Sequence, residues 1–188
     1  MTTYISLLRG INVSGHKLIK MEALAKSFEM LGFKNIKTYL QSGNVVFSWI
    51  KVDPKEIEQK ISRQIENDFG FDVSVVVLTI ENLLHIVENN PFINSPERNP
   101  TYFQITFLSS KPQTDNFSVI EQKKQVGEEI SFSNHAVYLH CPNGYGKTKL
   151  TNNLLESKLQ VIATTRNWKT TNELLKLAKE LEKKQFSK

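Results

Sequence analysis

Tyr4-Ile5-Ser6-Leu7-Leu8-Arg9-Gly10-Ile11-Asn12-Val13-Ser14-Gly15 places a polar, glycine-containing segment directly after a largely apolar run. The apolar run predicts a strand, and the segment from Arg9 onward predicts a loop that presents backbone N–H groups and a cation at the strand's end. Similar polar breaks recur at residues 41–44, 143–148 and 164–168. We therefore interpret the chain as a scaffold that displays four polar segments.

The composition is that of a globular protein with a sizeable core. The chain has 188 residues, 39% of them apolar, which suffices for one domain or for two small domains that share an interface. The single cysteine, Cys141, cannot form an internal disulfide, and the N-terminus lacks the pattern of a secretory signal. A cytoplasmic location without membrane association is expected, because no apolar run approaches the roughly 20 residues of a membrane span.

The net charge of +5 is unevenly distributed along the chain. Residues 1–50 hold six Lys/Arg against two Glu, residues 51–142 hold eight against thirteen acids, and residues 143–188 hold ten against four. If the fold brings the two ends together, their fields add into one basic face that carries several of the polar segments. The alternative is that the Lys-rich helix faces merely keep the protein in solution.

The first 79 residues predict the order strand, helix, strand, strand, helix, strand, which is the ferredoxin-like βαββαβ pattern. After the first strand, the predicted elements are helices over 21–31 and 53–69, a hairpin of strands 36–40 and 45–47, and a buried strand over 73–78. Asp53 and Pro54 are typical of a helix start, and Gly32 and Gly70 suit the left-handed residue after a helix.

The second half repeats this element order without a visible residue-level repeat. A short helix over 80–89 and a Pro/Asn-rich linker connect the two halves. The elements predicted after the linker are, in order, a strand over 102–108, a helix over 115–125, a hairpin of strands 130–133 and 136–140, a helix over 147–158 and a strand over 161–164. Thr170 and Glu173 predict a capping box for a closing helix. We therefore expect an α+β fold with ferredoxin-like halves at 1–79 and 102–165, a linker at 80–101, and a C-terminal helix at 166–188 packing on the core.

Gly144-Tyr145-Gly146-Lys147-Thr148 lies between a predicted strand and a predicted helix, where N–H groups and Lys147 can hold a phosphate. The P-loop match is incomplete, because Cys141 stands where the first glycine is needed. Nucleotide hydrolysis is thus disfavoured. Simple anion binding and a glycine-mediated helix entry both remain open.

Two further sets of residues offer polar groups to a ligand. Arg166-Asn167-Trp168 combines a bidentate cation, an amide and a stacking surface, which suits a phosphate joined to a base or sugar. Arg9, Asn12, Gln41 and Asn44 supply the donors of the first two polar segments. Each set has a structural alternative: Trp168 plugs the junction between the halves, Arg166 bonds to carboxylates or helix-end carbonyls, and the asparagines make local turn bonds.

No metal, cofactor or catalytic set is predicted. His135, His140 and Cys141 are close in sequence, but on a strand Cys141 points away from His140. A ferredoxin-like sheet can also bind RNA, yet residues 44–47 and 137–140 lack the aromatic signature of that module. Whether any reaction is catalysed is not decided by the sequence.

The chain resembles the bacterial family catalogued as domain of unknown function 1697. The resemblance covers nearly the whole chain and rests on four segments: Leu8-Arg9-Gly10-Ile11-Asn12-Val13, Tyr39-Leu40-Gln41-Ser42-Gly43-Asn44-Val45-Val46-Phe47, Asn90-Pro91-Phe92, and Thr164-Thr165-Arg166-Asn167-Trp168 with Thr170. It implies two ferredoxin-like halves and no established activity. The family often has Gly-Arg-Ser-Lys-Leu where this chain has Gly146-Lys147-Thr148-Lys149-Leu150, which keeps the cation and the hydroxyl.

Three functions fit these observations. The first is binding of a phosphorylated small molecule or nucleotide through Arg9, Asn12, Gln41, Asn44, Lys147, Arg166 and Trp168. The second is association with nucleic acid through phosphate contacts alone, and a purely structural or protein-binding role is a third alternative. The first function predicts that Arg166 is a solvent-facing cation close to the Arg9–Asn12 loop.

Overall fold

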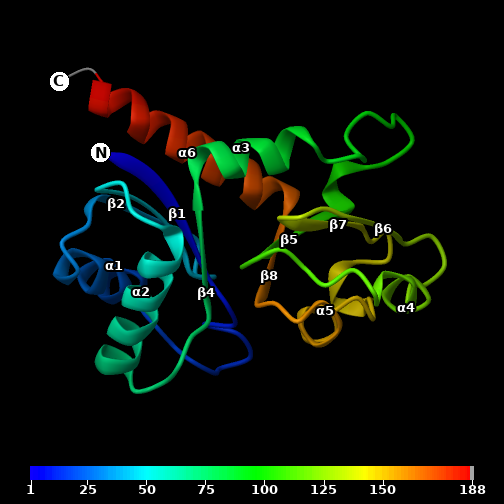
Figure 1. Ribbon diagram of the computed structural model, residues 1–188, viewed down its shortest axis with the longest axis horizontal. Helices are drawn as coiled ribbons and strands as arrows, with labels where there is room; N and C mark the ends of the chain where they lie inside the picture. Colours follow the sequence, from blue (N-terminus) through cyan, green and yellow to red (C-terminus); the bar gives the residue numbers. More distant parts are fainter. Residues whose placement is uncertain (187–188) are drawn as a thin grey trace. The chain divides into compact units, whose positions relative to one another are not determined.

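The computed structural model describes residues 1–186 and contains two four-stranded antiparallel sheets (Figure 1). The strands are β1 Thr2–Leu8, β2 Lys34–Tyr39, β3 Asn44–Trp49, β4 Val75–Thr79, β5 Phe103–Leu108, β6 Glu129–Phe132, β7 Ala136–His140 and β8 Ala163–Asn167. The helices are α1 Met21–Met30, α2 Pro54–Phe69, α3 Ile80–Glu88, α4 Phe117–Glu121, α5 Asn152–Leu159 and α6 Trp168–Phe186, with 3₁₀ turns η1 Pro100–Tyr102 and η2 Tyr145–Lys147. The α+β fold with two βαββαβ-like sheets and a C-terminal helix is confirmed.

The chain divides into two compact units. The first contains residues 1–84 and the chain from Glu173 onward, and the second contains His85–Asn172. Helices α3 and α6 therefore each begin in one unit and end in the other. No helix within residues 1–186 is long and apolar enough to cross a bilayer.

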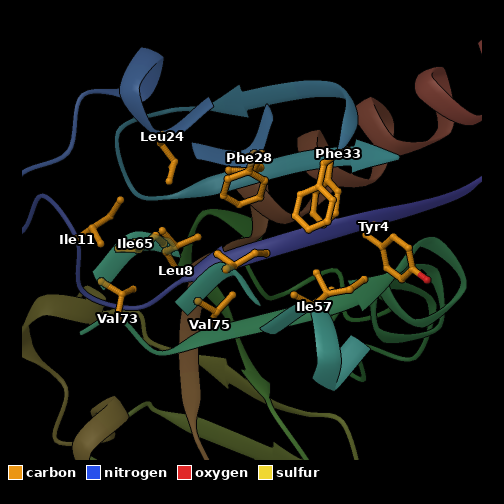
Figure 2. Packing of buried hydrophobic residues seen from close by; sticks show 14 of the residues in the cluster. Tyr4, Leu8, Ile11, Leu24, Phe28, Phe33, Ile57, Ile65, Val73 and Val75 are labelled. Carbon is orange, nitrogen blue, oxygen red and sulfur yellow. The ribbon is translucent and has the colours of Figure 1, made fainter. Parts of the chain in front are cut away.

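Strand β1 is the centre of the first sheet, whose order is β2-β3-β1-β4. It pairs antiparallel with β3 on one side and β4 on the other, so that Tyr4 stands opposite both Phe47 and Thr79. One face of the sheet packs on α1 and α2 around buried aromatic rings (Figure 2). The Phe47 ring lies 4.5 Å from Phe33 and 5.4 Å from Phe28, centre to centre, and aromatic pairs of this kind add about 1 kcal/mol each beyond their buried area.

The opposite face of this sheet contacts the last turns of α6. The Gln185 side-chain amide donates to Thr3 Oγ1 at 3.2 Å and to Ser48 Oγ at 2.7 Å. Lys37 of β2 lies 3.8 Å from the Glu180 carboxylate. Leu174, Ala178 and Leu181 of the same helix are buried. The first sheet is thus covered by helices on both faces, which explains why β1 and β3 are almost continuously buried.

Local helix signals in the first unit are confirmed. Asp53 caps α2 by accepting the Lys55 N–H, Pro54 is its first residue, and Gly70 ends it in the left-handed conformation with φ +77°. Gly32, after α1, also has a positive φ. These residues decide the helix ends because their side chains, or the absence of one, satisfy terminal backbone groups locally.

The second unit repeats the arrangement, with β5 central in the order β6-β7-β5-β8. Leu108, Val137, Leu139 and Ala163 of the sheet pack with α4 and α5 in a second apolar core. On the other face, the buried Tyr138 hydroxyl donates to the Ile86 carbonyl of α3 at 3.0 Å.

Backbone bonds at the end of the central strand show the repeat residue by residue. In the first unit, the Leu8 N–H donates to the Gly43 carbonyl at 2.8 Å, and the Arg9 N–H donates to the Ser74 carbonyl at 2.9 Å. In the second unit, the Leu108 N–H donates to the His135 carbonyl at 3.1 Å, and the Ser109 N–H donates to the Ile162 carbonyl at 2.9 Å. Arg9 and Ser109 are therefore equivalent positions, although their sequence surroundings differ.

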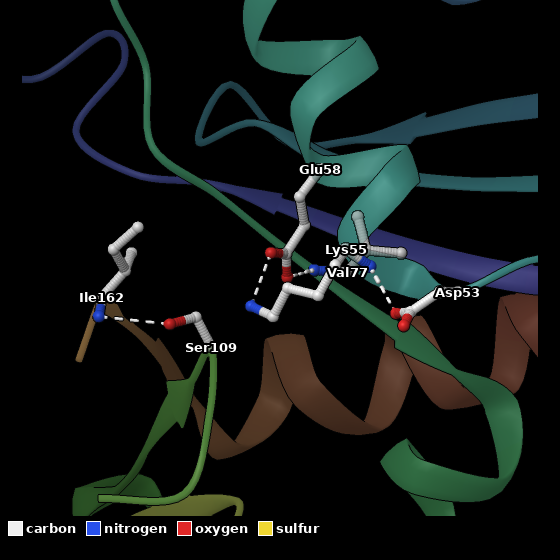
Figure 3. A network of polar contacts seen from close by, with 6 residues as sticks. All are labelled: Asp53, Lys55, Glu58, Val77, Ser109 and Ile162. Carbon is white, nitrogen blue, oxygen red and sulfur yellow. Dashed lines mark hydrogen bonds and ion pairs between the residues drawn. The ribbon is translucent and has the colours of Figure 1, made fainter.

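Each unit also protects its outer edge strand with a glutamate from the preceding helix. Glu58 of α2 accepts the Val77 N–H at 3.0 Å and pairs with Lys55 at 2.7 Å (Figure 3). Glu156 of α5 accepts the Ala163 N–H at 2.9 Å. A carboxylate on an unpaired edge N–H prevents that group from recruiting another strand.

Four predictions of local structure are wrong in the second unit, and three of them concern helices. The helix expected over 147–158 begins at Asn152, because Thr151 accepts the Leu154 N–H as its cap, and η2 occupies the preceding glycine segment. The helix expected over 115–125 is limited to α4, where Ile120 is the only buried residue. The closing helix starts at Trp168, since Asn167 Oδ1 accepts the Thr170 N–H, so Thr170 is not the cap.

The strand expected over 161–164 is also displaced. It runs from Ala163 to Asn167 and pairs with β5, which places Arg166 opposite Ile105. The polar segment 164–168 is therefore not a displayed loop. It is an edge strand that continues directly into α6.

Gly43→Ala should lower the free energy of unfolding by about 2 kcal/mol or more. A Cβ there would lie 2.7 Å from Leu8 Cβ, and φ is +72°, so steric overlap adds to backbone strain. Gly10→Ala is the matched control, because φ is +69° and nothing lies within 4 Å of the new Cβ. It should cost only about 1 kcal/mol. Equal losses in urea titrations of the two variants would contradict the close packing.

Candidate functional site

The first two polar segments meet in the first unit. The Asn12 amide donates to the Ile19 carbonyl at 2.9 Å and to the Gln41 carbonyl at 2.7 Å, and its oxygen accepts the Ile19 N–H at 2.8 Å. The Arg9–Gly15 loop is thereby closed on itself and tied to the hairpin between β2 and β3. Asn12 has φ +55°, a conformation that asparagine tolerates better than most residues.

These contacts divide the four expected donors into two kinds. Both amide hydrogens of Asn12 are used inside the protein. Asn44 is fully buried, and its amide donates to the Tyr39 carbonyl and to Ser42 Oγ. Arg9 is half-buried and Gln41 is exposed, so these two side chains are the ones in this cluster that reach solvent.

In the second unit, the glycine segment forms a compact turn with Lys147 on its surface. Gly144 adopts φ +90°, and the Lys147 N–H donates back to the Gly144 carbonyl at 3.1 Å. The Lys147 carbonyl accepts from Gln125 at 3.0 Å, while its side chain is exposed. No long helix starts at this turn, so a helix dipole does not contribute to anion binding here.

A chain of hydroxyl groups connects this turn to β8. Thr165 Oγ1 donates to Asn152 Oδ1 at 2.6 Å and accepts from the Tyr145 hydroxyl at 3.0 Å. Because Thr165 has one hydroxyl proton, Thr106, at 2.7 Å, must be the donor in the remaining bond. The network fixes the Tyr145–Lys147 turn against the sheet.

Arg166 lies on the other face of β8 and is 9% exposed, which corrects the expectation of a solvent-facing cation. Its guanidinium donates to Thr164 Oγ1 at 2.9 Å and to the Thr165 carbonyl at 2.8 Å. Burial lowers the pKa of Arg166 to about 10. Trp168 is half-buried, with its ring edge-on to Phe103 at 6.2 Å.

The repeat makes the composition of β8 unusual. Ile5 stands opposite Leu78 in the first unit, and Ile105 stands opposite Arg166 in the second. By the same registers, Val76 and Val77 of β4 correspond to Thr164 and Thr165 of β8. The second unit thus has two hydroxyls and a guanidinium where the first has three aliphatic side chains.

One ionic cluster was not predicted from the sequence. Arg98 donates to both carboxylate oxygens of Glu129 at 2.6 and 2.7 Å, and its guanidinium carbon lies 5.3 Å from the centre of the Phe92 ring. The bonds from Arg98 hold the pKa of Glu129 below its ordinary value, and His140, 3.4 Å away, acts in the same direction. Thirty-one positions separate Arg98 from Glu129, so no local pattern could reveal the pair.

His140 and Cys141, which are adjacent in sequence, lie in different surroundings. His140 lies among Phe92, Tyr102 and Phe103, whereas Cys141 is buried in the core beside α5. Burial raises the pKa of the Cys141 thiol to about 11, which leaves it protonated at neutral pH. Within residues 1–186, no group of three or more His, Cys, Asp or Glu side chains could hold a metal ion.

Comparison with known proteins gives the chain a family. The model described as "Protein of unknown function (DUF1697)" matches residues 1–138. The chain belongs to the DUF1697 family. The structure of the conserved bacterial protein SP0830 from Streptococcus pneumoniae is similar, with a TM-score of 0.70 and 25% identity over 94% of this chain and 98% of that one. No curated protein matches. The DUF1697 match includes the Arg9 loop and the β2–β3 hairpin, but it ends before η2 and β8.

Asn12→Ala should lower the free energy of unfolding by about 1–3 kcal/mol, because two Ile19 backbone groups and the Gln41 carbonyl lose their partner. Gln41→Ala is the control, since Gln41 joins this network through its backbone, and it should change stability by less than about 0.5 kcal/mol. Hydrogen exchange at the Ile19 N–H should accelerate in the first variant only. Unchanged exchange there would show that Asn12 does not hold the loop.

Proposed function

We propose that this DUF1697 protein binds a phosphorylated small molecule or nucleotide, and that the site lies in the second unit. The observation that carries the proposal is the change from Val76, Val77 and Leu78 in β4 to Thr164, Thr165 and Arg166 in β8. Polar and cationic side chains at positions that a repeated scaffold fills with aliphatic ones need internal hydrogen-bond partners to be tolerated, which supports a role for them beyond packing.

The geometry of the turn before α5 supports the same proposal. Lys147 offers a mobile ammonium group, and the Tyr145 and Thr165 hydroxyls lie within hydrogen-bond distance of each other on a fixed network. An exposed ammonium group on a turn that this network fixes suits phosphate oxygens.

The proposal concerns binding and assigns no catalytic step. The buried Cys141 is a poor nucleophile, because its thiol stays protonated. The hydroxyl network also orients the Thr165 proton toward the Asn152 side-chain oxygen, which is not a general base. These groups position a ligand, and they do not form a nucleophile and base pair.

A thermal-shift screen of nucleotides and sugar phosphates tests the proposal. A ligand present at one hundred times its Kd should stabilise the protein by about 2.7 kcal/mol. Lys147→Ala should abolish most of that shift, whereas Lys149→Ala, which removes an exposed lysine two residues away, should retain it. No response to any phosphate compound, or equal responses of the two variants, would contradict the proposal.

Nucleic-acid association is the competing outcome of the same experiment. Filter binding at two salt concentrations should detect no retention above background if the ligand is a small molecule. Retention that falls linearly with the logarithm of salt concentration and ignores base sequence would instead assign the basic groups to phosphate-backbone contacts.

A further inference from the structure

We infer a separate binding site for an amphiphilic anion in the first unit, in a pocket between the edge strand β2 and the end of α6. The pocket has a volume of about 670 Å³. Its basic lining residues are Lys34, Lys37 and Lys184, and its apolar ones include Ile36 and Leu181. We call it the Lys34 pocket. All of its lining residues belong to the first unit, so it is distinct from the η2 turn.

The charge of the Lys34 pocket selects an anion. Three lysines line it, and Glu180 borders it through a 3.8 Å contact with Lys37. Lysine ammonium groups gathered on a concave surface attract anions, because the surrounding protein focuses their field. The pocket therefore favours a phosphate or carboxylate group.

The floor of the pocket selects an apolar body for that anion. Ile36 is half-buried and Leu181 is buried, so a ligand that enters covers hydrocarbon surface as well as the ammonium groups. A volume of this size is within the range of small-molecule sites. An alkyl phosphate or fatty carboxylate combines both features.

Addition of a peptide strand along β2 fits the geometry less well. The ladder between β2 and β3 is interrupted between Lys34 and Lys37, and Asn35 has φ +54°. A bulge and lysines on an edge strand are features that prevent strand pairing. The inferred ligand therefore contacts the side chains that line the pocket and does not pair with the β2 backbone. A small amphiphile fits this requirement.

The pocket is also held in shape by bonds that two of its lining residues, Gln185 and Asn35, make to the sheet. Gln185 donates to Thr3 and Ser48 on two neighbouring strands, which fixes the end of α6 against the sheet. Asn35 donates to Ser48 Oγ at 3.2 Å from the other side. The two walls thus meet at Ser48, and the site needs no large rearrangement to receive a ligand.

Isothermal titration with dodecyl phosphate, below its micelle concentration, tests the inference. The Lys34→Glu/Lys184→Glu variant should bind at least about tenfold more weakly, because attraction becomes repulsion at two positions. Lys51→Glu/Lys60→Glu is the control, since it reverses two exposed lysines of the same unit with the same change in net charge. It should bind like the unchanged protein. Equal affinities of the two double variants, or no binding to the unchanged protein, would overturn the inference.

Two additional arms separate the parts of the ligand. Ile36→Ser should weaken dodecyl phosphate binding and leave any response to inorganic phosphate unchanged, whereas equal weakening of both would contradict the apolar subsite.

Flotation with phosphatidylglycerol vesicles identifies the source of the anion. Vesicle binding that requires Lys34 and Lys184 would assign the pocket to a lipid headgroup, and its absence alongside dodecyl phosphate binding would assign it to a free amphiphile. Unfolding midpoints of all variants report whether each remains folded.

Discussion

The N–H groups at the end of each central strand bond to both neighbouring segments, and the polar loops depend on these bonds for their positions. Leu8 bonds to the hairpin at Gly43, while Arg9 bonds to Ser74 just before β4. In the first unit the approach is so close that position 43 has no space for a Cβ. Asn12 then joins the loop to the hairpin through its side chain. A loop that could have been mobile is thereby fixed relative to the sheet.

The two units use one backbone plan for different side chains. Both units make the same backbone bonds at the end of the central strand. Both also have a helix glutamate, Glu58 or Glu156, that accepts an N–H of the fourth strand. Their fourth strands do not correspond, because β4 is aliphatic and β8 has hydroxyls and Arg166. A buried guanidinium with a pKa lowered to about 10 is a costly replacement for leucine. This contrast in side chains is the main physical difference between the two sheets.

The sequence predicted what local chemistry decides. The strand and helix order, the Asp53 cap and the left-handed glycines follow from periodicity and from backbone groups satisfied within a few residues. The prediction from the sequence failed where a partner far away in the sequence determines the local structure. The Thr164-Thr165-Arg166 segment reads as a loop by composition, yet pairing with β5, about sixty positions away, makes it a strand. The approach of Gln185 to Thr3 and the Arg98–Glu129 pair have no local signature either. Of the expected site residues, Asn12 and Asn44 have their amide donors engaged within the protein, a detail that composition alone does not reveal.

Arg166→Leu, combined with binding of a phosphate compound found in the thermal-shift screen, tests the central claim most directly. Leucine is the residue at the equivalent position of β4, so the variant should remain folded with an unfolding free energy equal to or above that of the unchanged protein. The proposal predicts that this folded variant loses at least about tenfold in affinity, since the Arg166 guanidinium bonds to Thr164 Oγ1 and the Thr165 carbonyl and thereby holds the β8 segment that carries the Thr165 hydroxyl. Unchanged affinity together with a loss of several kcal/mol in stability would show instead that Arg166 is a structural clamp, and the polar β8 would then have no role in binding.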